Sequence, residues 1–141
     1  MILKKRKSIL YLLFFIPFFL HAQSVKVVTN QVGYEEGKAK KAVIVADTKM
    51  VISTFRLVDA DTHKTVYEGK TVFSGPVSKW KNWLFWTIDF SHYTAPGNYQ
   101  LQIVASKNII SSYPFIIGRN VLEKATISDV VYYFKGQRSS G

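Results

Sequence analysis

Apolar and polar residues alternate with a period of two from Val25 to about Ile117, which predicts β-strands rather than helices. The strongest run is Trp83–Phe90, in which large apolar side chains recur at every second position and share one face. We expect Trp86 to lie in the core on that face. The predicted strands are 25–29, 41–46, 54–59, 65–68, 83–90, 99–104 and 112–117. About seven short strands at this spacing predict an all-β sandwich.

Two polar segments are predicted turns between these strands. Asp59 and Asp61 resemble a catalytic carboxylate pair, but their place between two strands favours a hairpin turn in which Asp accepts backbone hydrogen bonds. For Asp89, solvent exposure or turn bonding is the interpretation. Tyr99 follows the Pro96–Gly97 reversal and is placed like a tyrosine corner, whose hydroxyl bonds back to the chain. An ordinary core tyrosine is the alternative.

The periodicity changes to 3.6 between Val121 and Lys135, which predicts a helix. Ile127, Val130, Val131 and Phe134 fall on one face of it. Asn120 is the expected capping residue. No second helix follows within the chain to cover this apolar stripe, and such a stripe needs a partner. We therefore expect a larger body beyond Gly141.

The N-terminal segment predicts a secretory signal peptide over residues 1–22. Met1–Lys7 is basic, Ile9–Leu20 is almost wholly apolar, and Ala22 is a small residue at the expected cleavage point. A transmembrane anchor is the alternative, but the run has about 12 residues whereas a span needs about 20. We expect a secreted or periplasmic protein with no membrane attachment after cleavage.

Composition narrows the partners. The chain has no cysteine, which excludes a lipoprotein anchor, disulfides and a thiolate metal site. The formal net charge is +10, and four of the positive residues belong to the predicted signal. The remaining lysines are scattered, whereas nucleic-acid binders concentrate charge on one face, so we expect no nucleic-acid partner. His63 and His92 are not spaced with carboxylates as metal ligands and are expected at the surface.

Three motifs in order carry a family resemblance. They are Asn30–Tyr34 (NQVGY); Asp89–Ser91 followed by Pro96–Tyr99 (PGNY); and Ser112–Ile117 (SYPFII) followed by a helix that closes in YYFKGQRSSG. Together they resemble the N-terminal immunoglobulin-like domain of glycoside hydrolase family 9, the cellulase and endoglucanase family. The fold implied is an immunoglobulin-like β-sandwich over residues 23–118. Residues 119–141 would then be a linker and the start of a truncated catalytic domain.

The resemblance also implies a function. Complete members carry an (α/α)6 barrel after this domain and hydrolyse β-1,4-glucans with inversion, using two aspartates and a glutamate. An inverting site needs two carboxyl groups about 6.5–9.5 Å apart. All three residues would lie beyond Gly141, so we expect no catalytic residue, cofactor or metal in this chain, and no activity by itself. The expected partners are the catalytic barrel of the same polypeptide and a β-glucan.

Two groups of residues are candidate contacts. The polar and aromatic residues that flank the junction are expected to touch the barrel: Gln31, Tyr34, Tyr133, Phe134, Gln137 and Arg138. Trp80 and Trp83 lie near lysines and are candidates either for domain packing or for stacking on sugar rings. A free-standing carbohydrate-binding or adhesion module is the alternative function, and a periplasmic chaperone-like sandwich has no specific support. The uncovered terminal helix favours the support domain, because an independent module has no use for it.

Overall fold

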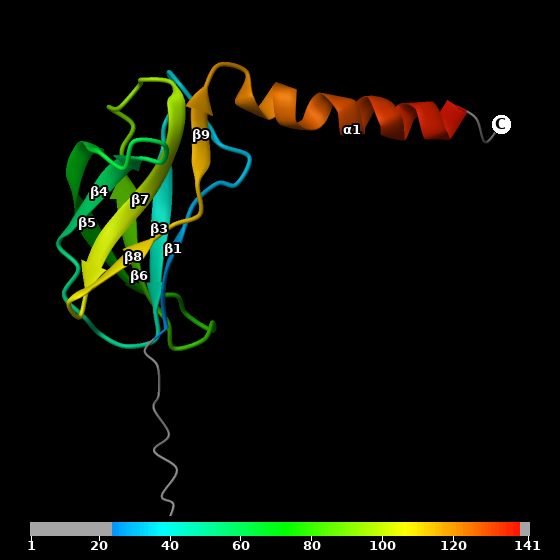
Figure 1. The fold of residues 1–141 in the computed structure, drawn as a ribbon. Helices are drawn as coiled ribbons and strands as arrows, with labels where there is room; N and C mark the ends of the chain where they lie inside the picture. Colours follow the sequence, from blue (N-terminus) through cyan, green and yellow to red (C-terminus); the bar gives the residue numbers. More distant parts are fainter. Residues whose placement is uncertain (1–23, 139–141) are drawn as a thin grey trace, which may run out of the picture.

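The computed structural model describes residues 24–138, so the predicted signal peptide lies outside the described residues. Within that range the chain forms strands followed by one helix (Figure 1). The strands are β1 (Val25–Val28), β2 (Tyr34–Glu35), β3 (Lys41–Ala46), β4 (Thr54–Asp59), β5 (Thr65–Pro76), β6 (Leu84–Asp89), β7 (Gly97–Ala105), β8 (Asn108–Ser111) and β9 (Phe115–Gly118). The helix is α1 (Val121–Arg138).

The strands form two sheets that face one another and share one strand. The order is β1-β3-β6-β5-β4-β7-β9-β2, with β8 beside β7. The first half of β5 pairs with β4, and its second half pairs with β6. This long strand therefore crosses from one sheet to the other and curls the whole into a sandwich. All neighbouring pairs are antiparallel except β2 with β9, which is parallel.

The core lies between the two sheets and follows the predicted alternation. Ile44, Trp86 and Ile88 come from one sheet, and Leu57 and Leu101 come from the other. Trp86 is 3% exposed, as its position in the strongest run predicts. Burying a large aromatic side chain of this kind removes about 150–250 Å² from water. The all-β sandwich predicted from the sequence is confirmed.

The described residues contain nine strands rather than about seven. The two extra strands are short: β2 has two residues and β8 has four. The second half of β5 was also not predicted, because Gly69 and Gly75 interrupt the pattern. Gly69 is required by packing, since a Cβ there would lie 2.5 Å from the Phe55 ring. The sequence pattern predicts that the strand ends at Gly69, although the strand continues because this glycine leaves room for the Phe55 ring.

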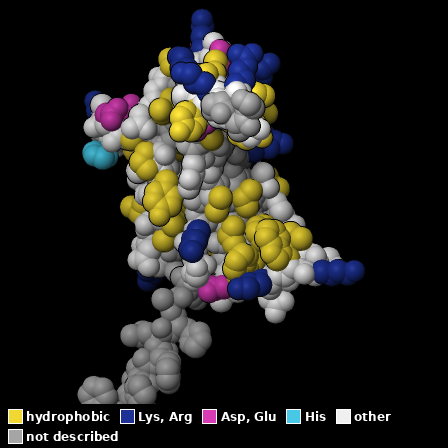
Figure 2. Space-filling model, turned by 90° about the vertical axis from the view of Figure 1, so that its right-hand side faces the viewer, with side chains coloured by type: hydrophobic (Ala, Val, Ile, Leu, Met, Phe, Trp, Pro, Cys, Tyr) yellow, Lys and Arg dark blue, Asp and Glu magenta, His cyan; other side chains and the backbone are white. Residues whose placement is uncertain are grey.

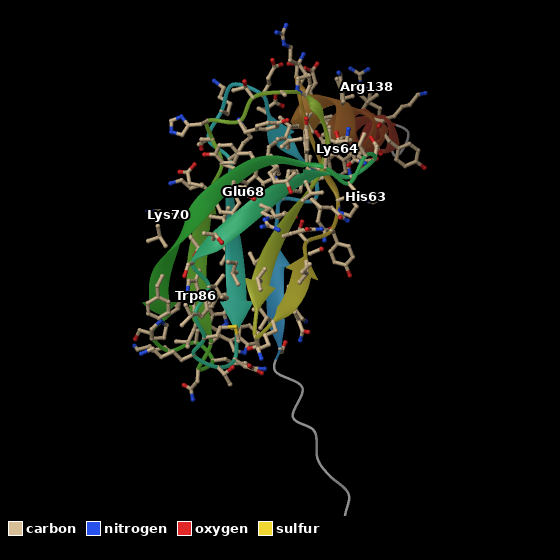
Figure 3. The ribbon with its side chains drawn as sticks, turned by 60° about the vertical axis from the view of Figure 1, so that its left-hand side comes forward. His63, Lys64, Glu68, Lys70, Trp86 and Arg138 are labelled. Carbon is tan, nitrogen blue, oxygen red and sulfur yellow. The ribbon has the colours of Figure 1, made fainter. Side chains whose placement is uncertain are left out.

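The predicted turns are confirmed. Asp59 Oδ1 accepts hydrogen bonds from the backbone N–H groups of Asp61 at 3.1 Å and Thr62 at 2.7 Å. Asp89 Oδ1 likewise accepts from the Ser91 N–H at 3.0 Å. The bond from the Thr62 N–H holds the pKa of Asp59 below the usual range, because it favours the charged carboxylate. The Ser91 side chain, followed by the Ser91 N–H, does the same for Asp89. Figure 3 places His63 and Lys64 in the same turn as Asp59, at the end of the sandwich from which α1 leaves.

Tyr99 forms the predicted corner. Its hydroxyl donates to the Pro96 carbonyl at 3.3 Å and accepts from the Tyr93 hydroxyl at 3.1 Å. The phenol lies directly over Gly97, where a Cβ would come within 2.7 Å of the hydroxyl oxygen. Gly97 is therefore required for packing as well as being a turn signal.

The corner predicts a loss of stability in alkali. Burial, followed by the electrostatic influence of Tyr93 and Asp59, raises the pKa of Tyr99 above the ordinary tyrosine value of about 10. The folded state then holds this proton more tightly than the unfolded state, so its contribution is present below pH 10 and is lost as the pH rises further. In thermal unfolding, Tyr99→Phe should be less stable than wild type at pH 7, and the Tm difference should narrow above pH 10. A constant difference would contradict this linkage.

Candidate functional site

The helix α1 projects from one end of the sandwich instead of packing on it (Figure 1). Val121 is buried, whereas Leu122 and the apolar residues further along are half or more exposed. They include the predicted stripe, namely Ile127, Val130, Val131 and Phe134. The sandwich therefore does not cover the apolar stripe. No helix within residues 24–138 is long and apolar enough to cross a membrane.

The first turn of α1 is nevertheless fixed to the sandwich by Glu35 at the end of β2. Its carboxylate accepts hydrogen bonds from the backbone N–H groups of Asn120 at 2.9 Å, Val121 at 2.6 Å and Leu122 at 3.3 Å. A carboxylate there satisfies donors that a helix leaves free and interacts favourably with the helix dipole. The capping group therefore comes from 85 residues away and is not the Asn120 side chain that the sequence suggested.

A salt bridge lies beside this cap. The Arg119 Nε and Glu36 Oε2 atoms are 2.8 Å apart, and Glu36 raises the pKa of Arg119. Arg119 is largely exposed, so solvent screens the bridge and it adds little stability. Glu36 thus holds the segment before α1, and Glu35 holds the first turn of α1. We call this region, Gly33–Lys40 with Arg119–Leu122, the joint.

Gly33 lets α1 approach the sandwich. Its φ is +112°, a conformation that favours glycine. A Cβ at this position would lie 2.6 Å from the Ile116 carbonyl oxygen and 2.7 Å from Val121 Cγ1. Val121 can pack there because position 33 has no side chain. The glycine of the NQVGY motif thus allows both the turn at position 33 and the close packing of Val121 at the start of α1.

Tyr34 belongs to the sandwich core, with 7% of its surface exposed. Its ring meets Phe90 and Phe115 edge-on, at centroid distances of 5.0 and 5.1 Å. Its hydroxyl donates to the Lys41 carbonyl at 2.8 Å and accepts from the Asn30 N–H at 3.0 Å, and burial raises its pKa. The side chain expected to touch a second domain therefore braces the joint from inside and has little free surface.

Lys40 is fully buried, with 0% of its surface exposed. Its ammonium donates to the backbone carbonyls of Glu36 at 2.8 Å and Lys38 at 2.9 Å, and more weakly to that of Glu35 at 3.4 Å. Burial lowers its pKa, while Glu36 and Asp89 oppose that shift. All three ammonium donors thus serve the loop that carries both glutamates. The lysine acts as an internal cation that gives this loop its shape.

The other predicted contacts do not converge on one place. Gln31 is exposed in the loop before the joint. Tyr133, Phe134, Gln137 and Arg138 are exposed in the last turns of α1, and the Tyr133 and Phe134 rings touch at a centroid distance of 5.7 Å. Arg138 is the last residue of α1, and Figure 1 shows that this end of the helix points away from the sandwich. At 1.5 Å per residue, about 20 Å of helix separates Val121 from Phe134. The predicted contacts are therefore spread along the helix and the loop rather than gathered in one site.

Trp80 and Trp83 lie in the β5–β6 loop, at the opposite end of the sandwich from the joint (Figure 1). Trp80 is 60% exposed and Trp83 is half-buried. Figure 2 shows hydrophobic side chains gathered near the lower end of the face from which α1 projects, with Lys or Arg beside them. The ring centroids of Trp80 and Trp83 are 6.3 Å apart, so the structure brings these two tryptophans together.

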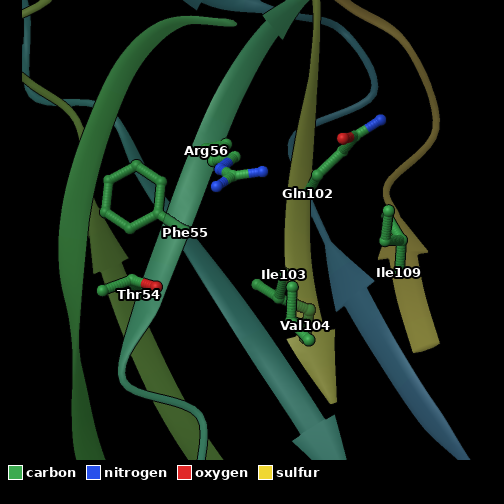
Figure 4. Close-up of a pocket in the computed structure, with 7 residues that line it drawn as sticks. All are labelled: Thr54, Phe55, Arg56, Gln102, Ile103, Val104 and Ile109. Carbon is green, nitrogen blue, oxygen red and sulfur yellow. The ribbon is translucent and has the colours of Figure 1, made fainter. Parts of the chain in front are cut away.

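Hollows in the described surface are open and shallow. One on the outer face of β4 and β7 holds about 50 Å³ between residues such as Arg56 and Gln102 (Figure 4). That volume is far below the 300–1,000 Å³ of typical ligand pockets. A groove of about 420 Å³ runs between β1 and β8 and includes Gln31. A second hollow of about 420 Å³ lies under the start of α1, between Ile116 and Ala125. No cluster of three potential metal-binding side chains occurs in residues 24–138.

An immunoglobulin-like sandwich with an outward helix defines the class of domain, and comparison with known proteins gives the family. A family model described as the cellulase N-terminal Ig-like domain matches residues 22–108. The chain therefore belongs to this family of domains. The resemblance inferred from the three motifs is confirmed.

Solved structures agree with this assignment. A metagenome-derived family 9 endoglucanase is 29% identical, with a TM-score of 0.54, over 67% of this chain and 18% of that protein. A family 9 glycoside hydrolase from Bacteroides ovatus is 30% identical, with a TM-score of 0.54, over 70% of this chain and 16% of that protein. The chain thus spans less than a fifth of either relative. No curated protein matches it.

Proposed function

We propose that this chain is the non-catalytic N-terminal support domain of a secreted family 9 glycoside hydrolase that acts on β-1,4-glucans. The domain family and the similarity to part of two family 9 enzymes support this proposal. The sandwich would hold and orient a catalytic barrel that follows it. The chain itself would supply no catalytic group, and an export signal over residues 1–22 would direct the enzyme out of the cytoplasm.

The observation that carries the proposal is the contrast between the two ends of α1. At its start, Glu35 and Gly33 fix the helix to the sandwich. Beyond that, Ile127, Val130 and Val131 are each at least half exposed. A helix held firmly at one end and apolar along its free length has the form of the first element of a second body, because such a surface needs a partner to leave water.

The substrate class follows from the relatives. Both similar structures are family 9 glycoside hydrolases, and one is named as an endoglucanase. A hollow of about 370 Å³ beside α1 is lined by Glu35 and Glu36, but Glu35 already caps the helix and Glu36 already pairs with Arg119. Hydrolysis of a glycosidic bond requires one carboxyl group that donates a proton and another that activates water or attacks. The division of labour we propose therefore places cleavage in the barrel and support in the sandwich.

The test compares this chain with the complete polypeptide. The chain alone should release no reducing sugar from soluble β-glucan, whereas the complete polypeptide should do so. In the complete polypeptide, Val131→Asp should lower the Tm of the catalytic part by several degrees, since it places a charge in the proposed contact. In the chain alone, the same change should leave the sandwich Tm within about 1 °C, because Val131 is 57% exposed.

Two controls make the comparison decisive. Lys124→Asp tests a charge change on an exposed, polar position of the same helix and should be nearly neutral in both forms. Turnover by the chain alone would contradict the non-catalytic role. An unchanged Tm of the complete Val131→Asp protein would contradict the support role.

A further inference from the structure

The β5–β6 loop holds its tryptophans in a fixed arrangement. The Trp80 ring stacks on Phe85 with a centroid distance of 5.7 Å and an interplanar angle of 20°. Phe85 is in β6 and is buried at 9% exposure, so it forms a firm base. The backbone N–H of Trp80 donates to the Val77 carbonyl, and the backbone N–H of Trp83 donates to the Lys81 carbonyl. The ring of Trp80 is thus fixed on one side by Phe85, and 60% of the residue remains in water.

The rim of this surface is polar. Lys79, Lys81 and Asn82 are exposed, and the Lys81 ammonium lies 5.2 Å from the centroid of the Trp83 ring. Trp80 and Trp83 are inclined to one another by 50°. The arrangement is therefore two non-parallel aromatic faces surrounded by hydrogen-bond donors.

This chemistry favours a sugar polymer over a protein partner. A β-linked pyranose ring presents an apolar C–H face that packs on an aromatic ring, while its equatorial hydroxyl groups point outward to donors at the rim. A protein interface core is instead depleted of charged residues and enclosed by a larger apolar area. Here lysines stand beside the rings, and one of them covers Trp83.

The β5–β6 loop lies at the end of the sandwich away from the joint. Leu84, which follows it, pairs with Ala46, and Ala46 pairs with Val25 at the start of β1. The joint lies at the other end, where Glu35 pairs with Gly118. Occupation of the tryptophan surface would therefore leave the first turn of α1 undisturbed.

We propose that Trp80 and Trp83 form a binding platform for a neutral β-glucan chain, separate from the support role at the joint. Trp80 stacks on a pyranose ring, and Trp83 contacts the same or the adjacent ring once Lys81 moves to bond with hydroxyl groups. The interaction needs no catalytic body, so it can be measured on this chain alone. A failed support role and a failed platform are therefore distinguishable.

Affinity electrophoresis through gels containing a soluble neutral β-glucan tests the proposal, together with fluorescence titration by cellohexaose. We expect retardation of the chain, and about fivefold to tenfold weaker binding for Trp80→Ala, in line with the loss of one aromatic contact. Trp83→Ala should weaken binding to a smaller extent. Tyr113→Ala is the matched control, because Tyr113 is a 76% exposed aromatic residue outside the loop. It should bind like wild type. Cooperative thermal unfolding of the Trp80, Trp83 and Tyr113 variants, with a Tm well above the assay temperature, establishes that all three are folded.

Several results would overturn the platform. They are no retardation of the wild-type chain, equal binding by Trp80→Ala and wild type, or the same loss in Tyr113→Ala. Binding only to an anionic polysaccharide such as polygalacturonate, with release by salt, would assign the site to the lysines and overturn the proposal. Destabilisation of the complete polypeptide by Trp80→Ala without loss of glucan binding would assign the tryptophans to domain packing instead.

Discussion

Lys40→Met should lower the free energy of unfolding by about 2–4 kcal/mol. The ammonium of this fully buried residue serves two close backbone carbonyls and a third at 3.4 Å. Methionine has a similar length but no donor, so the Glu36 and Lys38 carbonyl oxygens would lose the ammonium as a partner, whereas the Glu35 carbonyl would keep the Lys38 N–H. The loss can be measured by urea denaturation of the chain at pH 7.

The neighbouring Lys38 is the control for this effect. It is in the same loop but is exposed, and Lys38→Met should change the free energy of unfolding by less than about 0.5 kcal/mol. The internal cation also shapes the segment that presents Glu35, so Lys40→Met should speed amide hydrogen exchange in the first turn of α1. Equal free energies of unfolding for Lys40→Met and Lys38→Met would contradict a stabilising role of Lys40 in the joint.

Gly33→Ala should be at least as harmful, at about 2–4 kcal/mol. A methyl group would meet the Ile116 carbonyl and Val121 at distances that real Cβ atoms do not show, and alanine disfavours a φ of +112°. Because the obstacle is backbone on one side and the helix on the other, α1 must shift for the fold to survive. Chemical denaturation gives the cost, and exchange of the Val121 and Leu122 amides reports the shift.

Gly37→Ala separates these causes from a general effect of replacing glycine. Gly37 has no heavy atom within 4 Å of its would-be Cβ and no positive φ. The variant should be neutral or slightly stabilising, since alanine reduces the freedom of the unfolded chain. If both glycines tolerate alanine equally, the close approach of α1 to the sandwich is not essential.

Periodicity alone predicted most of the sandwich, because alternation and turn chemistry are local properties. Trp86 in the core, the Asp59 turn and the Tyr99 corner each depend on neighbours a few positions away, and the structure confirms all three. The second half of β5 was missed because Gly69 is small for the sake of the distant Phe55 ring. A sequence pattern does not contain that contact.

The joint was predicted only in outline. The NQVGY motif and the helix were both identified, but the groups that connect them come from residues far apart in sequence. Nothing in the residues around Glu35 marks it as the cap of a helix more than 80 residues away. Nothing in the residues around Lys40 marks it as a buried lysine. Identifying it from sequence would require knowledge of how the loop folds around it.

The chain enters and leaves the sandwich at opposite ends. Ser24 precedes β1 beside Asp47, at the far end from Gly118, and α1 then continues outward (Figure 1). The β-sandwich is thus a rigid spacer with the length of its strands. A reporter or affinity tag attached ahead of Ser24 would be kept away from residues that follow Arg138. An internal insertion at Gly37 would instead lie within the joint.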